Sequence, residues 1–172
     1  MIDRDVFEHL SPSAMQWAMA QEKLILECGM PLSERATADA VRAGVKDPSR
    51  VRVLVVDRIP LPDDKALAEA SRRIDLITES SRAIAIGRGI VIRADRWGDR
   101  ELLVHQLVHV AQSERCGGTE PYVRQYLGDR RDCAEFTLGA FEEEARRLAR
   151  EICREPEGRG QYEVTDARSV GS

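Results

Sequence analysis

The chain has 172 residues, of which 33% are charged and 42% are hydrophobic, and its formal net charge at pH 7 is −4. This length is enough for one domain with a proper core. Because acidic and basic residues are interspersed, we expect neither a dedicated nucleic-acid-binding protein nor a membrane-surface protein. The acidic start, residues 1–5, lacks the pattern of a signal peptide, and no stretch has the length and apolarity of a membrane span. The sequence therefore predicts a cytoplasmic protein.

Turn and capping residues divide the chain into helices and strands. The predicted helices cover about residues 13–28, 33–44, 64–77, 99–116, 119–127 and 136–154. The predicted strands cover about residues 51–56, 82–86 and 90–93. Ser13 with Gln16 fits a capping box, Asp63 or Asp64 is suited to cap the third helix, and residues 128–132 are predicted to be a charged loop. This mixture predicts an α+β fold.

The four cysteines are widely spaced and include no Cys-x-x-Cys pair. They are Cys28, Cys116, Cys133 and Cys153. In a chain without an export signal, free thiols are the expected state. A zinc site built from cysteines remains the less favoured alternative.

Two of the three histidines, His105 and His109, lie four residues apart in an apolar stretch, and they are the most informative feature of the sequence. Asp99 is suited to cap the helix that carries them. On a helix, residues four apart point to the same side, so both imidazoles can reach one metal ion. The spacing is that of the His-Glu-x-x-His helix of zinc peptidases, except that Gln106 occupies the position of the glutamate. A histidine pair on the surface or in the core, with no metal, is the alternative interpretation.

A catalytic zinc ion takes three protein ligands and a water molecule, so a third ligand is needed. No Gly-x-x-His follows the second histidine, which argues against a site of three histidines. The better candidate lies in an acidic cluster on the last predicted helix, where Glu144 is followed by Ala145. Glu142 and Glu143 remain competitors. For all three acids, the alternative is a solvated helix face paired with arginines one turn on.

The pattern of two histidines on one helix, followed by Glu-Ala on a later helix, resembles the gluzincin branch of the zincin metallopeptidases, whose small members are called minigluzincins. The surrounding sequence is also similar to small bacterial proteins with Leu-Val-His-Glu-Leu-Val-His-Val-Ala-Gln, then Gly-Gly and a tyrosine-bearing helix. The corresponding segments here are residues 103–112, 117–118 and 122–126. The resemblance covers about residues 51–150. It implies a zincin-like fold, in which a small mixed sheet packs on the zinc-binding helix.

By this resemblance, the zinc ligands are His105, His109 and Glu144, and position 106 holds the general base that takes a proton from the zinc-bound water. Gln106 can hydrogen-bond that water but cannot take its proton. General acid–base catalysis contributes on the order of 10²–10⁴ in rate, so we expect zinc binding to be kept and peptide hydrolysis to be severely reduced. Either the chain is a natural pseudo-enzyme or its glutamate has been replaced, and the intact remainder of the motif favours the second.

Further roles are expected around this site. Tyr126 or Tyr122 can stabilise the oxyanion as a phenol donor, although packing against the neighbouring helix is the more ordinary role of a tyrosine. The strand at Ile84–Ile86 can pair with an extended peptide substrate, as edge strands of zincins do, and its alternative is an ordinary strand of the sheet.

The predicted domain spans residues 1–154, with a helical N-terminal part over 1–46, and residues 155–172 are predicted to form a flexible tail. The predicted function is that of a zinc-dependent metallopeptidase that acts on a peptide or protein and is impaired by Gln106. The alternative is a non-catalytic, zinc-stabilised domain that binds a peptide or protein through the same cleft, and a metal-free helical adaptor is a third. A further hypothesis is that the tail or the first two helices cover the cleft.

Overall fold

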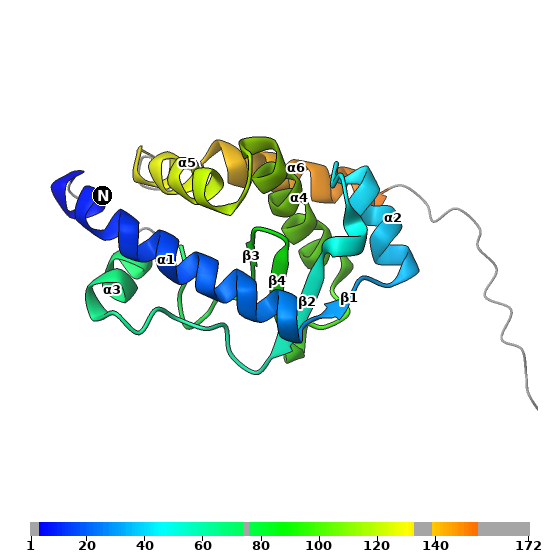
Figure 1. Ribbon diagram of the computed structural model, residues 1–172. Helices are drawn as coiled ribbons and strands as arrows, with labels where there is room; N and C mark the ends of the chain where they lie inside the picture. Colours follow the sequence, from blue (N-terminus) through cyan, green and yellow to red (C-terminus); the bar gives the residue numbers. More distant parts are fainter. Residues whose placement is uncertain (1–3, 74–75, 133–138, 155–172) are drawn as a thin grey trace, which may run out of the picture.

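The computed structural model describes residues 4–73, 76–132 and 139–154. This part of the chain forms six α-helices and one four-stranded sheet (Figure 1), so the predicted α+β class is confirmed. The helices are α1 Arg4–Cys28, α2 Glu34–Arg42, α3 Lys65–Arg73, α4 Arg100–Cys116, α5 Thr119–Asp132 and α6 Ala140–Arg154. The strands are β1 Met30–Pro31, β2 Arg52–Val56, β3 Ala83–Ile86 and β4 Gly89–Arg93. The predicted flexible tail, 155–172, lies outside the described residues.

The sheet has the strand order β1-β2-β4-β3 and mixes parallel and antiparallel pairs. Strands β2 and β4 are parallel, with Val53 opposite Ile90, whereas β1 pairs with β2 and β3 pairs with β4 in antiparallel fashion. Strand β3 is therefore an edge strand, and it is joined to β4 by a tight turn in which Gly87 has a φ of 59°. The β2–β4 crossover contains α3.

Helices cover both faces of the sheet, with α1 crossing one face and α4 packing on the other (Figure 1). Side chains on a strand alternate between faces. Accordingly, Ile90 and Ile92 of β4 join the core built with α4 and α6, whereas Val91 joins the core built with Ile25 of α1. Helix α6 packs on α4 and contributes Ala145 to the same core. The histidine-bearing helix is thus held between the sheet and α6.

Both ends of α4 are set by capping residues. At its N-terminus, the side chain of Asp99 accepts a hydrogen bond from the N–H of Leu102 at 3.0 Å. At its C-terminus, Gly117 adopts the left-handed conformation with a φ of 95°, which only glycine adopts without strain. These caps agree with the sequence prediction, and they fix the length of the helix on which the histidines lie.

A buried ion pair joins α2 to the first residue of α4. The guanidinium of Arg100 donates from Nε and Nη2 to the two carboxylate oxygens of Asp39, at 2.9 and 2.8 Å. The side chain of Asp39 is 6% exposed and that of Arg100 is 24% exposed, so this bidentate contact is shielded from solvent mainly on the side of the acid. It ties the helical N-terminal part of the chain to the start of the histidine-bearing helix.

A second tether runs from α1 to the β3–β4 turn. One carboxylate oxygen of Glu22 accepts from the backbone N–H of Arg88 at 3.0 Å, and the other accepts from the hydroxyl of Thr119. A Cβ at Gly87 would collide with this carboxylate. The single acid therefore holds α1, the β3–β4 turn and the start of α5 together.

The first helix begins earlier than the sequence predicts. It starts at Arg4 rather than Ser13 and continues through Pro12. A proline inside a helix gives up one hydrogen bond, normally made to the carbonyl four residues earlier. Leu10 and Trp17, on either side of the proline, line the same cavity. The capping-box prediction was wrong because the helix runs through Ser13, which leaves no helix end there to cap.

Two other predictions differ from the structure. Residues 128–132, predicted to be a charged loop, continue α5, and the carboxylate of Asp129 accepts from the backbone N–H of Phe141 at 3.3 Å. This contact with α6 favours a helix where the local composition favours a turn. The two-residue strand β1, Met30–Pro31, was not predicted, because its pairing with β2 leaves no pattern in so short a segment.

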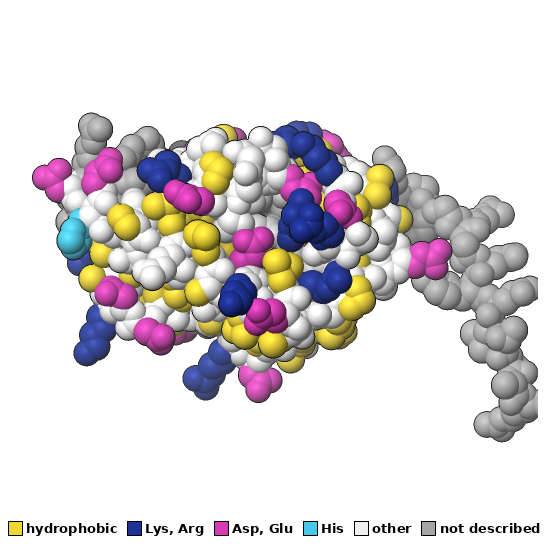
Figure 2. Space-filling model, in the orientation of Figure 1, with side chains coloured by type: hydrophobic (Ala, Val, Ile, Leu, Met, Phe, Trp, Pro, Cys, Tyr) yellow, Lys and Arg dark blue, Asp and Glu magenta, His cyan; other side chains and the backbone are white. Residues whose placement is uncertain are grey.

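Acidic and basic side chains alternate over the face drawn in Figure 2, with apolar side chains between them. Among the described residues, we find no helix that combines the length and the apolarity required to cross a membrane.

Candidate metal centre

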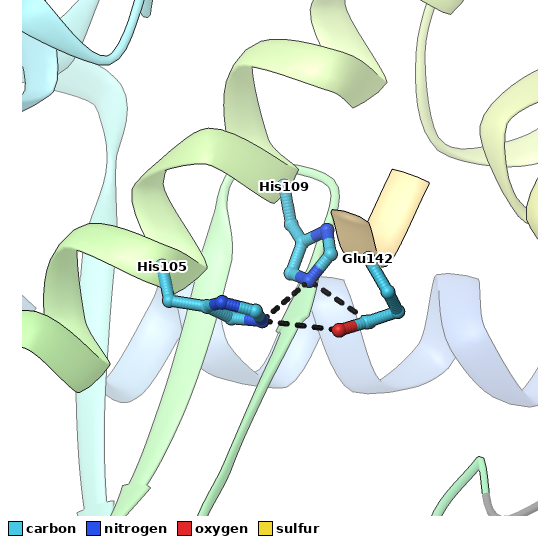
Figure 3. Close-up of side chains that lie close together, drawn as sticks. All are labelled: His105, His109 and Glu142. Atoms are coloured by element: carbon cyan, nitrogen blue, oxygen red, sulfur yellow. Dashed lines mark hydrogen bonds and ion pairs between the residues drawn. The ribbon is translucent and has the colours of Figure 1, made fainter. Parts of the chain in front are cut away.

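Two successive turns of α4 bring the imidazoles of His105 and His109 together, as expected from their spacing. Their Nε2 atoms lie 3.0 Å apart, and the ring planes make an angle of 82° (Figure 3). The side chains are 20% and 7% exposed respectively, so His105 lies nearer the solvent. Both Nε2 atoms face the space next to α6.

Glu142, near the start of α6, completes a group of three (Figure 3). Its Oε2 lies 3.3 Å from Nε2 of His105, and its Oε1 lies 3.1 Å from Nε2 of His109. Within the described parts of the chain, this is the one cluster of histidine, cysteine or acidic side chains with the spacing of metal ligands.

The distances in this cluster fit a tetrahedral metal ion. Two ligand atoms bound 2.0–2.1 Å from a tetrahedral ion lie about 3.3 Å from each other. The two histidine Nε2 atoms lie 3.0 Å apart, and those of His105 and His109 lie 3.3 and 3.1 Å from Oε2 and Oε1 of Glu142 respectively. Two imidazoles and one carboxylate are also a common ligand set of catalytic zinc, with the fourth position left open for water.

Glu144, the favoured third ligand of the sequence prediction, lies elsewhere. Its Oε2 accepts from Arg115 at 2.6 Å and from the amide of Gln112 at 2.8 Å. Burial raises the pKa of this carboxyl, but the hydrogen bonds from Arg115 and Gln112 outweigh it and hold the pKa below its ordinary value. The structure thus places Glu142, and not Glu144, beside the histidines, because successive helical residues point in directions about 100° apart. Glu143, the other competitor, is exposed.

Buried polar side chains surround the far side of the His109 ring. Its Nδ1 lies 2.8 Å from Oε1 of Gln112 and 3.1 Å from the hydroxyl of Tyr122. Gln112 is fully buried, and Tyr122 is 4% exposed. Tyr122 therefore lies behind the histidine, away from the Nε2 atom that faces Glu142. This position does not suit it as an oxyanion donor.

Tyr126 lies on the open side of the cluster and donates its hydroxyl to Oε1 of Glu142 at 2.5 Å. Burial, together with the negative charge of Glu142, raises the pKa of this phenol well above its usual value. Burial likewise raises the pKa of Glu142, but hydrogen bonds from His105, His109 and Tyr126 outweigh burial and hold that pKa far below its ordinary range. A protonated phenol therefore faces an ionised carboxylate. Its role as an oxyanion donor stays a prediction.

A cavity of about 770 Å³ opens onto the cluster, a volume typical of ligand-binding pockets. His105, His109 and Glu142 line it, and so does Gln106. Gln106 is 5% exposed and occupies the helical position next to the first histidine. Gln106 thus lines the same cavity as the cluster, and its role there stays a prediction.

Apolar side chains from α1 and β3 also line the cavity. Helix α1 contributes Trp17 and Ala18 to it, and the edge strand β3 contributes Ile84 and Ile86. The N-terminal helix is therefore part of the cavity, which bears on the hypothesis that the first helices cover the cleft. The version of that hypothesis that uses the tail lies outside the described residues.

From the sequence, Gln112 has no predicted role, and Glu142 ranks behind Glu144 as the third ligand. Glu142 lies three and seven positions before Ala145 and Ala149, the buried small residues of α6, and this periodicity places it nearest the packed face of the helix. Gln112 lies three positions after His109, on the same side of α4. Both signals were present in the sequence, and helical periodicity identifies them better than the Glu-Ala pair does.

The described cysteines take no part in the cluster. Cys28, Cys116 and Cys153 are free thiols, as predicted, and burial raises the pKa of Cys116 and of Cys153. Cys133 lies outside the described residues.

We compared the chain with family models, with curated proteins and with solved structures, and none of them matches it. The features that point to a function are therefore the geometry of the cluster and the histidine motif of α4.

Proposed function

We propose that the protein binds one zinc ion through His105, His109 and Glu142, and that it is a zincin-like metallopeptidase of the gluzincin type whose general-base position carries Gln106. The observation that supports this most directly is the convergence of two imidazole nitrogens and a carboxylate, with separations of 3.0 to 3.3 Å. The imidazole nitrogens and the carboxylate thus lie within reach of one another, as the ligands of one zinc ion would.

A zinc ion bound there would polarise a water molecule and the carbonyl of a substrate. The residue at position 106 then limits the rate of hydrolysis. Gln106 can hydrogen-bond a water molecule or hold a substrate group in the cavity, but its amide cannot accept a proton at neutral pH. Peptide hydrolysis by this chain is therefore reduced on the order of 10²–10⁴ relative to the same protein with glutamate at this position.

Two features next to the cluster suit a peptide. Strand β3 is an edge strand that lines the cavity, and an extended chain can add to such an edge through backbone hydrogen bonds. The cavity, lined there by apolar side chains of α1 and β3, offers room for a substrate side chain. Both features serve a peptidase and a peptide-binding domain equally.

Gln106 favours one alternative, a zinc-stabilised domain that binds a peptide or protein in this cavity without cleaving it. The two functions share the ligands and differ in chemistry alone. The Gln106→Glu variant separates them, because it supplies the missing base without changing the size of the side chain. Cleavage of a broad peptide library by this variant, and little or none by the parent, supports the peptidase. A zinc-loaded variant that cleaves nothing supports the binding domain.

Zinc binding itself is tested by elemental mass spectrometry of the purified protein. We expect about one zinc per chain. His109→Ala and Glu142→Gln should each lose the metal, whereas Glu143→Gln, a matched change at the next and exposed residue, should keep it. No stoichiometric metal after zinc is supplied, or equal zinc in Glu142→Gln and Glu143→Gln, would contradict the proposal and favour a metal-free adaptor or a different third ligand.

A further inference from the structure

The side chain of Gln112 is fully buried between the proposed metal site and α6, and each of its polar atoms has a partner. Its Nε2 lies 2.9 Å from the carbonyl oxygen of Phe141 and 2.8 Å from Oε2 of Glu144. Its Oε1 lies 2.8 Å from Nδ1 of His109. The amide thus bridges the second histidine of α4 and two acceptors that lie about one turn apart on α6.

The chemistry of these partners fixes how the amide is oriented. A carbonyl oxygen and a carboxylate can only accept hydrogen bonds, so the atom of Gln112 that faces Phe141 and Glu144 has to be the NH₂ group. The other end, which faces His109, is then the amide oxygen, which can only accept. Consequently Nδ1 of His109 has to carry a proton, because otherwise two acceptors would face each other at 2.8 Å.

Tyr122 agrees with this assignment. Its hydroxyl lies 3.5 Å from Oε1 of Gln112 and 3.1 Å from Nδ1 of His109. A protonated Nδ1 has no lone pair to offer, so the hydroxyl donates toward the amide oxygen and presents its own oxygen to the Nδ1–H. With the proton on Nδ1, every group behind the histidine ring has a hydrogen-bond partner of the opposite kind.

We propose that Gln112 is a positioning residue for the metal site: its amide oxygen holds a proton on Nδ1 of His109, so that Nε2, the nitrogen beside His105 and Glu142, is the one that binds the metal. This inference rests on the proposed function for its metal, but not for the position of the proton. The far end of the amide is anchored by Glu144, which is itself held by Arg115 at 2.6 Å. Glu144, which the sequence predicts as a ligand, therefore contacts no ligand directly and acts on His109 through Gln112.

The test pairs Gln112→Met with Gln16→Met, the same change at an exposed residue of α1. Zinc affinity is measured by competition with a chromophoric chelator, and the proton of His109 is located by long-range nitrogen-15 NMR, assigned with the His109→Ala variant. We expect Gln112→Met to weaken zinc binding about 10- to 100-fold, as loss of a hydrogen-bond partner behind a ligand does. It should also release the Nδ1 proton to fast exchange. Gln16→Met should change neither.

A double variant checks the direction of the hydrogen bonds. The double variant carries Gln112→Glu and Glu144→Gln. The new carboxylate at position 112 can still accept a hydrogen bond from His109, and the new amide at position 144 can donate to that carboxylate, so the direction of the contact between positions 112 and 144 is reversed. This protein should recover most of the zinc affinity that Gln112→Met loses, although Phe141 loses its donor. If Gln112 acted through packing alone, the double variant should not regain zinc affinity. The proton position of His109 should then also be the same in every variant.

Some results would overturn the inference. Wild-type protein with Nδ1 of His109 unprotonated contradicts it directly, and this measurement needs no zinc. Gln112→Met with the affinity and spectrum of Gln16→Met contradicts it as well. By contrast, wild-type protein that binds no zinc, yet shows the Nδ1 proton lost in Gln112→Met, overturns the proposed function and leaves the hydrogen-bond assignment in place.

Discussion

Tyr126 and Glu142 face each other across the boundary between α5 and α6, with the phenol oxygen 2.5 Å from Oε1 of the carboxylate. This contact gives the tyrosine an orienting role toward the acid, besides the oxyanion role predicted from the sequence. The two roles have different consequences and can be separated.

The first prediction concerns Tyr126→Phe. If the hydroxyl orients Glu142, its removal should lower zinc affinity about tenfold, as loss of an outer partner of a metal ligand does. If it also stabilises an oxyanion, kcat should fall in a Gln106→Glu background even at saturating zinc. Zinc competition and peptidase assays measure the two effects. Trp97→Phe, an exposed aromatic change, is the control and should alter neither. An unchanged zinc affinity in Tyr126→Phe would argue against the orienting role.

The second prediction is that zinc stabilises the fold. A ligand that binds the folded state alone adds about 2.7 kcal/mol when its free concentration is 100 times its Kd, and for a chain of this size that raises Tm by roughly 5–10 °C. Thermal unfolding with zinc and with a chelator measures the difference. The His109→Ala variant should show the same Tm in both conditions. A zinc-induced rise in that variant would show that the metal binds elsewhere.

The third prediction concerns the ion pair between Asp39 and Arg100. Asp39→Ala takes the bidentate contact from Arg100, whose side chain is 24% exposed, so it should lower the free energy of unfolding by about 3 kcal/mol, the low end of the cost of breaking a buried pair. Urea denaturation gives this value. Glu69→Ala removes the acid of an exposed pair on α3 and should have little effect, because solvent screens such contacts. A loss as small as that of the control would mean that the Asp39 contact contributes no more than a surface pair.

The fourth prediction compares two glycines with positive φ. Gly98, with a φ of 99°, has no atom within 4 Å of a built Cβ, so Gly98→Ala should cost about 1 kcal/mol from backbone strain alone. Gly87, with a φ of 59°, faces the carboxylate of Glu22, so Gly87→Ala should cost about 2 kcal/mol or more, because it also displaces the tether of α1. Equal losses in urea denaturation would contradict the role given to Glu22.

Much of the arrangement around α4 could be predicted from the sequence, because the determinants are local. The cap at Asp99, the end at Gly117 and the shared side of His105 and His109 all follow from helix geometry. The α+β class also follows from the order of elements. The resemblance to zincins and the identity of the metal stay predictions.

The remainder depends on contacts between distant segments. The choice among the three acids of α6 is decided by how that helix is rotated against α4, and Glu142 has the position expected from the buried Ala145. Likewise, helix α5 continues past Gly128 because Asp129 contacts Phe141 on the next helix. No local pattern contains such a contact, so the predicted charged loop was wrong at that point.

The two histidines and Gln112 all belong to α4, whereas Glu142 belongs to α6. A metal ion held by these ligands would act as a cross-link between two helices that are otherwise joined by packing and hydrogen bonds. Its loss should leave the histidine pair in place, because one capped helix carries both rings, and should loosen α6 instead. Amide hydrogen exchange would then quicken at the start of α6 more than along α4 when zinc is removed. Access to the cavity would in that case depend on metal occupancy, since the helix freed by the missing ion forms one of its walls.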